Sequence, residues 1–598
     1  MPSYRRLIPS ILLAAVLAAC AAQPRPDAAA QAAAPASAAP ATTAAAQSAA
    51  AAYDYDMDVF HPVVARHGMV VSEQALASQA GLQMLQAGGN AVDAAVAVGF
   101  ALAVVLPNAG NLGGGGFMMV HSARDGQDVA LDFREMAPAR ASRDMYLDAD
   151  GKVADGRSLF THLAVGVPGT VAGLTHALER WGTLPLDRVM APAIRLAERG
   201  YPVSQMLAET LDKTRDTMGK WPATRAIFWR DGKPLQAGRM LVQKDLARSL
   251  RLIARQGARA FYQGPIGEGI AAEMARHGGL ITLQDLARYR TVERTPIVGT
   301  YRGYRVVTMP PPSSGGIHLV QILNMMEGWP IRQWGPGSAQ TIHHMAEAMK
   351  LAYADRSKYL GDTDFVQVPV AGLVSKAYAR RLAAGIDATH ARPSGEIQPG
   401  QPQPYESDQT THFSVVDAAG NAVAVTYTLN TNFGSGIVAA GTGILLNNEM
   451  DDFSAKPGVA NVYGLIGGEA NAIQPGKRPL SSMTPTLVLK DGKPWLVTGS
   501  PGGARIITTV LETVVDAIDF QMNPAEAAAV PRFHHQWWPD ELRVEKGLSP
   551  DTIALLRSYG QHVVVKPTMG KTQTIQVRDG LLYGASDPRN PDGAAIGR

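Results

Sequence analysis

The sequence predicts a globular protein of mixed α/β or α+β class with many turns, and two observations support this. Hydrophobic residues make up 46% of the 598 residues, while 60 glycines and 40 prolines indicate frequent turns. Segments with helical spacing of apolar residues also alternate with short runs rich in β-branched and aromatic residues. The chain is long for one ordinary domain, so its length suggests several.

The charge balance argues against a nucleic-acid partner. The formal net charge is only +3, and no basic run stands out along the sequence. A small-molecule substrate is therefore the default expectation.

The first 20 residues have the features of an export signal. Arg5 and Arg6 supply a positive start, and Leu7 to Ala19 form an apolar stretch too short to span a bilayer. The stretch ends in Leu-Ala-Ala-Cys, which resembles the cleavage box of bacterial lipoproteins, and Cys20 is the only cysteine in the chain. The alternative is an ordinary secretory signal with an incidental cysteine. We favour lipidation of Cys20, because its position and its uniqueness agree, and the lipid would hold the protein to a membrane.

Residues 21–52 are expected to form a disordered tether between the lipid and a folded body that begins near Tyr53. They are almost entirely Ala, Pro, Gln, Thr and Ser, offer little to bury, and contain prolines that interrupt helix formation. Ala21 resembles no retention signal. We therefore expect attachment to the outer membrane, with the protein facing the periplasm.

Two helices are predicted at the start of the folded body. Ser72 to Ala87 has helical spacing and stops at a Gly-Gly pair, which is typical of a helix C-terminus. Asn90 then caps a second helix, which has Asp93 in its first turn and runs apolar up to Pro107. Because Asp93 and Pro107 bracket this apolar run, we expect a buried core helix and not a membrane span.

A glycine-rich segment and two strands follow. Gly113 to Gly116 lacks the strand–turn–helix context of a dinucleotide-binding fingerprint, so we interpret it as a tight turn in closely packed backbone. Phe117–Val120 and Val129–Phe133 are predicted strands. Arg134 comes directly after the second strand, where a guanidinium can meet an anion, although most such arginines are only solvated.

The middle of the chain, from residue 170 to residue 300, is predicted to be mainly helical, with apolar spacing through Pro192–Arg199, Leu241–Gln256 and Ile266–His277. The pattern then returns to a turn over Asp285–Tyr289 and to a strand over Val298–Met309. A rigid proline-rich turn leads into a helix over Ile317–Glu327, and a further helix is predicted over Ala339–Tyr359.

Two histidine pairs, His343-His344 and His534-His535, raise the question of a metal site. Neither pair has the Glu-x-x-His spacing of a metal motif, and adjacent residues of a regular strand cannot both face one ion. We interpret both pairs as structural and expect no metal.

The segment from Gln409 to Asp417 is predicted to be the first strand of a hairpin whose second strand runs from Ala422 to Leu429. With a four-residue loop, Asp417 pairs with Ala422 and Thr410 faces Leu429. One bulged residue in the turn shifts the register and places Thr428 opposite Thr410. In either register the two threonines lie close together.

The residues before this hairpin suggest a processing site. Ser394 to Gln409 is polar, rich in Pro and Gln, and is expected to be an exposed loop. If the bond before Thr410 were cut, its free α-amine would have a pKa of about 7.7–8.0 and could take the proton of its own hydroxyl. Such a pair is an activated nucleophile. The alternative is a strand start with no chemistry.

Several long motifs occur in a fixed order on both sides of Thr410. Upstream are NLGGGGFM, DFREMAPA, GVPGTVAG and MPPPSSGG, and downstream are TTHFSVVDAAGNAVAVTYTLNTNFGSGI, GILLNNEMDDFSAKPG, KRPLSSMTPT and TGSPGGAR. Together they resemble the γ-glutamyltranspeptidase family of N-terminal-nucleophile hydrolases, over roughly residues 55 to 598. The resemblance implies a four-layer αββα sandwich. It also implies a heterodimer cut from one precursor, with residues 53–409 as the large subunit and 410–598 as the small catalytic subunit.

The resemblance assigns the catalytic groups to four positions. Thr410 is the nucleophile, Thr428 hydrogen-bonds it, and Gly502 and Gly503 form the oxyanion hole. Their segment, Gly499 to Gly503, also resembles a nest of backbone N–H groups in its own right.

The resemblance places the substrate around a second set of residues. It assigns the α-carboxylate to Arg134 with Ser481 and Ser482, and the α-ammonium to Glu449 and Asp452 with help from Asn430. The family has Gln or Glu at the position of Glu449, and both accept from an ammonium. The three carboxylates in Glu449–Asp452 do not have the spacing of a calcium loop. Tyr463, in the glycine-flanked segment 456–468, resembles the gate residue of a lid loop.

The implied activity is cleavage of the γ-glutamyl bond of glutathione and related compounds through a γ-glutamyl ester of Thr410. Water or an amino acid or peptide then takes the group, after autocatalytic cleavage between Gln409 and Thr410, and no metal or organic cofactor is needed. One alternative is a cephalosporin or glutaryl acylase of the same fold. Asp452 argues against it, because an acyl group without an α-amine leaves that carboxylate unpaired at a cost of roughly a few kcal/mol. The other alternative is an uncleaved lipoprotein that binds γ-glutamyl peptides, which would predict a missing site residue, and none is missing.

Overall fold

The computed structural model describes residues 56–398 and 410–598. The predicted signal peptide and tether, Cys20, and Gln409 with most of the segment before it lie outside the described residues.

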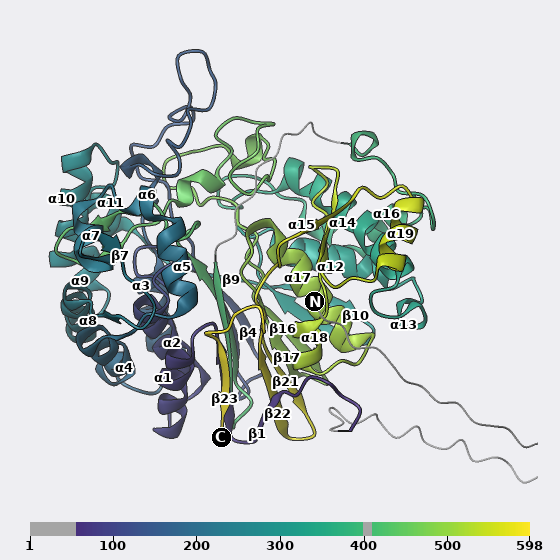
Figure 1. The fold of residues 1–598 in the computed structure, drawn as a ribbon, viewed down its shortest axis with the longest axis horizontal. Coiled ribbons are helices and arrows are strands. Elements are labelled where there is room, and N and C mark those ends of the chain that lie inside the picture. The colour runs from purple at the N-terminus through teal and green to yellow at the C-terminus, as the bar shows by residue number, and fades with distance from the viewer. Residues whose placement is uncertain (1–55, 399–409) are drawn as a thin grey trace, which may run out of the picture. The chain divides into compact units, whose positions relative to one another are not determined.

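Two seven-stranded antiparallel sheets lie at the centre of the fold (Figure 1). The first has the order β1 (Val63–Ala65), β22 (Leu581–Ser586), β21 (Gln573–Arg578), β17 (Lys493–Thr498), β16 (Thr486–Lys490), β11 (Tyr304–Thr308) and β10 (Ile297–Tyr301). The second has the order β23 (Ala594–Gly597), β2 (Gly68–Ser72), β12 (Thr411–Asp417), β13 (Ala422–Thr428), β3 (Gly115–His121), β4 (Asp128–Phe133) and β9 (Val292–Arg294). The sheets face each other, since β12 contacts both β17 and β21.

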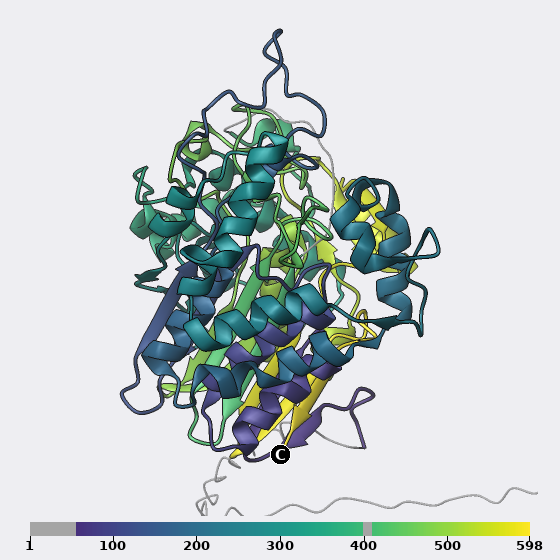
Figure 2. The same cartoon turned by 90° about the vertical axis from the view of Figure 1, so that its left-hand side faces the viewer.

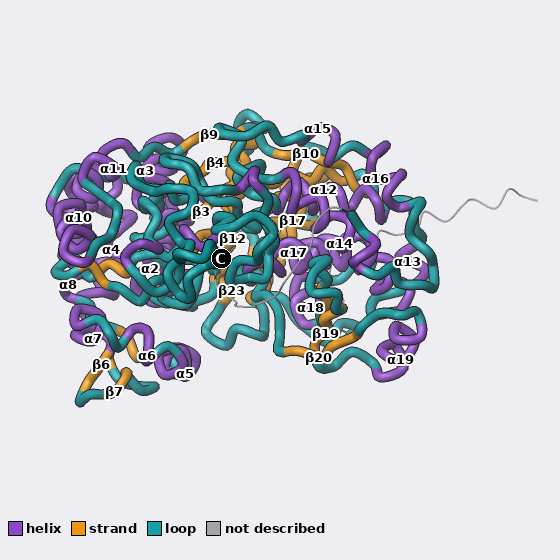
Figure 3. Tube along the Cα trace, turned by 90° about the horizontal axis from the view of Figure 1, so that it is seen from above, coloured by secondary structure: helices purple, strands orange, loops and turns teal. Residues whose placement is uncertain are grey.

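Helices cover the outer face of each sheet (Figures 1 and 3). On the second sheet lie α1 (Ala75–Gln86), α2 (Ala91–Val105) and α3 (Thr170–Trp181), while α4 (Leu186–Arg199) packs on α2 and α8 (Lys244–Gln256) packs on α4. On the first lie α12 (Gly315–Met326), α14 (Ala339–Tyr359) and α17 (Ile506–Ile518). Seen from the side of α1 to α4, helices lie across the strands behind them (Figure 2). The predicted four-layer αββα sandwich is confirmed.

Alternating side chains of the strands produce two separate cores. In β2, Val70 packs with α1 and α2, whereas Met69 and Val71 point to the space between the sheets. Both sides of these strands are apolar because both are covered.

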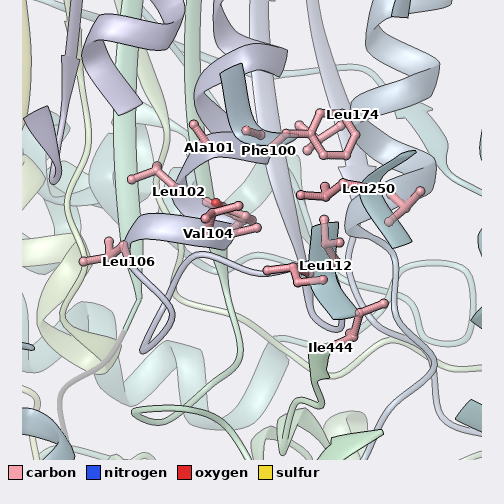
Figure 4. Packing of buried hydrophobic residues seen from close by; sticks show 14 of the residues in the cluster. Phe100, Ala101, Leu102, Val104, Leu106, Leu112, Leu174, Leu250 and Ile444 are labelled. Carbon is pink, nitrogen blue, oxygen red and sulfur yellow. The ribbon is translucent and has the colours of Figure 1, made fainter. Parts of the chain in front are cut away.

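Helix α2 is the buried core helix that its sequence predicts. Every one of its residues is buried, and Asn90 and Asp93 form a capping box at its start. Phe100 of α2 belongs to one buried cluster with Leu174 and Leu250 (Figure 4). Within the described residues, no helix is both long and apolar enough to cross a membrane.

The remaining elements are short and lie around this sandwich. The helices are α5 (Gln205–Lys213), α6 (Arg215–Met218), α7 (Pro222–Phe228), α9 (Arg259–Tyr262), α10 (Pro265–His277), α11 (Leu283–Arg288), α13 (Ile331–Trp334), α15 (Val370–Leu373), α16 (Lys376–Ala383), α18 (Pro524–Ala529) and α19 (Pro550–Ser558). The strands are β5 (Tyr201–Pro202), β6 (Trp229–Arg230), β7 (Lys233–Pro234), β8 (Met240–Leu241), β14 (Val438–Ala439), β15 (Ile444–Leu445), β18 (Phe533–His534), β19 (Leu542–Glu545) and β20 (Val563–Lys566).

Three local predictions need correction. The predicted turn over Asp285–Tyr289 is mostly helix α11, because Thr282 and Asp285 form a capping box that starts it. The predicted single strand over Val298–Met309 is the hairpin β10–β11, which turns at Arg302 and Gly303, both with positive φ. Ser394, expected in an exposed loop, is buried and bonded to Asp540.

Candidate active site

Thr410 lies at the entrance of β12, and the strand pairing decides between the two predicted registers. Val416 pairs with Ala422 and Thr411 with Tyr427, which is the bulged register and places Thr428 opposite Thr410. The Thr428 hydroxyl accepts a hydrogen bond from the backbone N–H of Asn430 at 2.8 Å. Thr410 is only 6% exposed and lines the same cavity as Thr428.

The glycine-rich segment supports the end of β13 at Thr428. A Cβ on Gly114 would lie 2.0 Å from the Thr428 carbonyl oxygen, and Asn111 donates to that same oxygen at 2.8 Å. The predicted close packing of this backbone is confirmed, since only glycine permits this approach. The predicted tight turn is wrong, because Gly115 and Gly116 belong to strand β3 and Gly113 forms a β-bridge with Leu446.

A single small cavity brings together most of the residues predicted for the site. Its volume is about 20 Å³, and its lining includes Arg134, Arg356, Thr410, Thr428, Asn430, Glu449, Asp452, Tyr463, Ser481, Ser482 and Gly503. Gly502, the other residue predicted for the oxyanion hole, directly precedes Gly503 in the chain. Since a volume of this size holds about one water molecule, an amino-acid head group requires the walls to move.

Arg134 is fully buried at the end of β4 and contacts both carboxylates that were assigned to the substrate ammonium. One terminal nitrogen donates to Glu449, and the other donates to Asp452 at 2.5 Å. Its Nε donates to the backbone oxygen of Pro479 at 3.2 Å. The resemblance assigned these residues to the carboxylate and the ammonium that share one α-carbon, and the structure places them in direct contact with each other.

Burial sets the protonation of this charged group. It raises the pKa of the Glu449 and Asp452 carboxyls above their ordinary values, while the positive charge of Arg134 opposes the shift. Burial alone would lower the pKa of Arg134, but the two carboxylates outweigh it, and its pKa lies above the usual value. The guanidinium therefore stays charged.

Two buried acceptor oxygens at this site have no hydrogen-bond partner. They are Oδ1 of Asn430 and Oε2 of Glu449. The Asn430 side chain is held in place because its amide donates to the backbone oxygen of Asn448 at 2.9 Å. Buried acceptors without a donor are costly, so this wall of the cavity is built to receive a group with several N–H donors.

The cavity lining also includes Ser481 and Ser482, whose segment is held by a neighbouring turn. The proline-rich segment before α12 holds Ser481, which donates its N–H to the Pro312 oxygen at 2.8 Å and accepts from the Ser314 hydroxyl at 2.7 Å through its own carbonyl. Arg356 of α14 donates to the Ser482 hydroxyl at 3.2 Å and to the Ser314 hydroxyl at 2.9 Å.

Arg356 is a cavity residue that the sequence analysis missed. It is buried, and burial lowers its pKa to about 10, so it remains charged at neutral pH. It adds a second cation to a cavity lining that already includes Arg134, Ser481 and Ser482, which suits an anionic group such as a carboxylate. Only its position near the C-terminal end of an otherwise buried helix could have drawn attention to it.

Gly502 and Gly503 form a loop that leads into α17. Their φ angles are +138° and +54°, a region that favours glycine. The 3₁₀ turn η5 (Gly503–Arg505) and the first residues of α17 follow directly, so the positive end of a helix dipole faces the loop. Backbone N–H groups placed in this way can stabilise an oxyanion.

Tyr463 covers this loop. Its ring lies so close to Gly503 that a Cβ there would be 2.4 Å from the ring, and its hydroxyl donates to the Asn430 carbonyl oxygen. The lid segment is tied down further by the N–H of Val462, which donates to Asp451 at 3.0 Å. Asp451 also accepts from the Ser158 hydroxyl at 2.6 Å, and burial raises its pKa to about 6.

The two histidine pairs bond to separate partners. In the first pair, the His343 ring hydrogen-bonds to the backbone oxygen of Asp387, whereas the His344 ring hydrogen-bonds to the backbone oxygen of Gln340. In the second, His534 bonds to Thr508, whereas His535 pairs with Asp540. This agrees with the structural role expected for both pairs.

Comparisons with known proteins agree over most of the chain. A family model described as Gamma-glutamyltranspeptidase matches residues 77–597. The chain is 61% identical over 549 residues to a glutathione hydrolase proenzyme of Escherichia coli strain K12, which covers 91% of this chain and 94% of that protein. It is 50% identical over 551 residues to a glutathione hydrolase proenzyme of Pseudomonas sp. strain A14, which covers 90% of this chain and 95% of that protein. A solved cephalosporin acylase from Bacillus halodurans has a TM-score of 0.79 at 30% identity and covers 91% of this chain and 98% of that one.

Proposed function

The chain belongs to the gamma-glutamyltranspeptidase family, and from this premise we propose how its own residues carry out the reaction. The protein is an enzyme that transfers or hydrolyses γ-glutamyl groups, with glutathione as the natural candidate donor. Thr410 is the proposed nucleophile, and the cavity around Arg134 holds the α-amino acid end of the donor.

The observation that supports this proposal is the presence of both donor and acceptor groups in the lining of one buried cavity. Asn430 and Glu449 offer oxygens without partners, while Arg356 and two serines line the same cavity. An α-ammonium would satisfy the acceptor oxygens, and an α-carboxylate would satisfy the donors. On binding, the carboxylate would share Arg134 with Asp452 and Glu449, so no charge is left unpaired.

Processing comes first in the proposed sequence of steps. The Thr410 hydroxyl oxygen attacks the carbonyl carbon of Gln409, the peptide C–N bond breaks, and the departing amine takes the hydroxyl proton. The acyl group has then moved from nitrogen to oxygen. Water hydrolyses this ester, which releases the Gln409 carboxylate and leaves Thr410 with a free amine and a free hydroxyl.

Transfer uses the same oxygen. The Thr410 hydroxyl attacks the donor γ-carbonyl while the Thr410 amine takes its proton, and the N–H groups of Gly502 and Gly503 bind the oxyanion. The leaving amine receives the proton and departs, which leaves a γ-glutamyl ester. Water or an acceptor amine attacks this ester and regenerates Thr410.

Asp452 separates this proposal from an acylase that takes acyl groups without an α-amine. γ-Glutamyl and glutaryl p-nitroanilides differ only in that amine, so they form a matched pair of substrates. We expect Asp452→Asn to lower kcat/KM for the γ-glutamyl substrate by about 10- to 100-fold, the range of one charged hydrogen bond, and to change glutaryl turnover little. Equal losses on both substrates would show that Asp452 does not bind the ammonium.

Intact mass and N-terminal sequencing test the remaining alternative, an uncleaved binding protein. A fragment that begins Thr-Thr-His-Phe supports cleavage before Thr410, and Thr410→Ala should stay as one chain. A wild-type chain that remains uncut over days at neutral pH would refute the proposed nucleophile.

We further propose that Cys20 carries a lipid that anchors the protein at the outer membrane, facing the periplasm. The position of Cys20 at the end of the apolar segment supports this.

A further inference from the structure

Two histidines and one glutamate meet in a cluster away from the active site. Glu273 and His277 lie one turn apart at the end of α10, and His162 belongs to the 3₁₀ turn η1 (His162–Ala164). The Nε2 of His162 lies 3.2 Å from Oε1 of Glu273, and the Nε2 of His277 lies 3.4 Å from the same oxygen. The three candidate ligand atoms all lie within 4.8 Å of one another.

These distances match part of a tetrahedral zinc site. With metal–ligand bonds of about 2.0–2.1 Å, the ligand atoms of a tetrahedron lie about 3.3 Å apart. Both Glu273–histidine separations already have this length. The third separation, between the two imidazoles, has to shorten.

His277 has the freedom to make that adjustment. Its side chain is 45% exposed and it is the last residue of α10, so it can rotate without disturbing the core. At present its ring is stacked on that of His162, with ring centres 4.7 Å apart. A metal ion lies in the plane of each imidazole that binds it, so the stack would have to open.

The ion pairs around the cluster leave one carboxylate oxygen of Glu273 to a cation. Arg276 opposes cation binding, but it pairs with the other carboxylate oxygen, Oε2, at 3.3 Å. Oε1 of Glu273, which faces both histidines, is therefore left to a metal.

We propose that His162, Glu273 and His277 bind a Zn²⁺ ion, with water as the fourth ligand. Two imidazoles and one carboxylate are ligands that zinc accepts. The ion would tie η1 to the end of α10. Since η1 packs against η3 (Glu449–Asp452), the metal would brace from outside the turn that carries the substrate-binding carboxylates. It takes no part in the proposed reaction.

Zinc titration of the full chain, without an affinity tag, tests the proposal. Trp221 lies edge-on to His162 with ring centres 5.0 Å apart, so its fluorescence should report binding alongside calorimetry. We expect one Zn²⁺ per chain and a higher midpoint of thermal unfolding with the metal. His277→Ala, an exposed change that should fold normally, should weaken binding by at least about tenfold.

His176 provides a matched control. It also pairs with a glutamate, since its Nε2 lies 3.0 Å from Glu293, but among the residues that the structure describes no second histidine completes a site there. His176→Ala should leave the affinity unchanged, and Arg276→Gln should keep or strengthen it. Absence of saturable Zn²⁺ binding, or equal binding by wild type and His277→Ala, would overturn the proposal.

Discussion

Asn430 combines two features that are uncommon in one residue. Its backbone has a φ of +80°, and its side-chain oxygen is buried without a hydrogen-bond partner. A left-handed conformation at a residue other than glycine costs of order 1–3 kcal/mol, and asparagine tolerates it better than most. The conformation turns the Asn430 carbonyl to Tyr463 and the side chain to the cavity wall. The conformation thus orients one residue towards both Tyr463 and the cavity.

Gly503→Ala should disable the oxyanion loop. The added Cβ would lie 2.4 Å from the Tyr463 ring, so the lid residue and the loop cannot both keep their places. We expect kcat to fall by about 10²- to 10³-fold, the loss typical of a disrupted oxyanion hole, in steady-state assays with a γ-glutamyl donor. Gly441→Ala is the control, because Gly441 also has a positive φ, of +77°, but has no neighbours within 4 Å. Equal effects of the two changes would mean that backbone strain, and not the contact with Tyr463, is responsible.

Arg356→Met should weaken donor binding more than it slows chemistry. The methionine keeps an apolar stem but leaves the hydroxyl of Ser482 without its guanidinium donor. We expect the KM of the donor to rise by about tenfold, which corresponds to one hydrogen bond from a charged group, with a smaller change in kcat. Combining this change with Ser482→Ala should give less than the sum of the two losses. Full additivity would show that Arg356 does not act through Ser482.

Sequence alone predicted individual site residues where local geometry restricts them. The hairpin register brought Thr428 near Thr410, and the glycine run indicated close backbone approach. Arg356 was not predicted as a cavity residue, because the sequence pattern of a helix does not show that an arginine in it is buried. The contact of Arg134 with Glu449 and Asp452 was not predicted either, because no local sequence pattern indicates contacts between residues more than 300 positions apart.

At the scale of elements, α17 carries two buried carboxyl groups one turn apart, Glu512 and Asp516. Burial raises the pKa of Asp516 to about 8, and it raises the pKa of Glu512 well above its ordinary value. Asp516 is therefore protonated in the folded protein at neutral pH. Its ionisation on unfolding makes stability depend on pH.

Asp516→Asn should flatten that dependence. The folded pKa of about 8 lies above the ordinary 3.8, so the folded state binds the extra proton between these values. The free energy of unfolding therefore falls as pH rises from about 4 to about 8, and the asparagine should remove a decline on the order of a few kcal/mol. Urea unfolding of the uncleaved Thr410→Ala chain across this range measures it. If wild-type and variant slopes coincide, Asp516 is ionised in the folded state.

Elements were predictable where caps and periodicity agree. Helix α2 was predictable from its N-cap residue Asn90, and helix α14 was predictable from the spacing of its apolar residues. Helix α11 was missed because it is only six residues long and its capping box lies within a turn-like composition. The β10–β11 hairpin was predicted as one strand because its turn, at Arg302 and Gly303, contains only one residue typical of turns.

At the scale of the whole molecule, Cys20→Ser tests the proposed anchor. A lipid supplies membrane attachment by burying its methylene groups, so the variant should move from the membrane fraction to the soluble periplasmic fraction. Ala21→Ser is the matched control and should stay with the membranes. Specific activity should be equal in all three proteins. Wild-type protein that is already soluble would indicate an ordinary secretory signal.

The layered architecture could not be derived from local patterns. Neighbouring strands such as β2 and β12 lie more than 300 residues apart in sequence, so no periodicity reveals that they pair. The four layers were expected only because long motifs resembled a known family. The sequence is nevertheless compatible with four layers, because strands that are apolar on both faces must be covered on both faces.

The order of strands in the two sheets affects whether the cleaved protein can refold after it unfolds. In the second sheet β12 and β13 lie between β2 and β3, and in the first sheet β16 and β17 lie between β11 and β21. Each sheet thus takes strands from both sides of the proposed cut before Thr410. An intact chain refolds by a first-order process, whereas a cut one must find its partner again, with a rate that depends on concentration. With the proposed cut, reassembly would be slow at low concentration, so the working lifetime would be governed by how slowly the two pieces come apart.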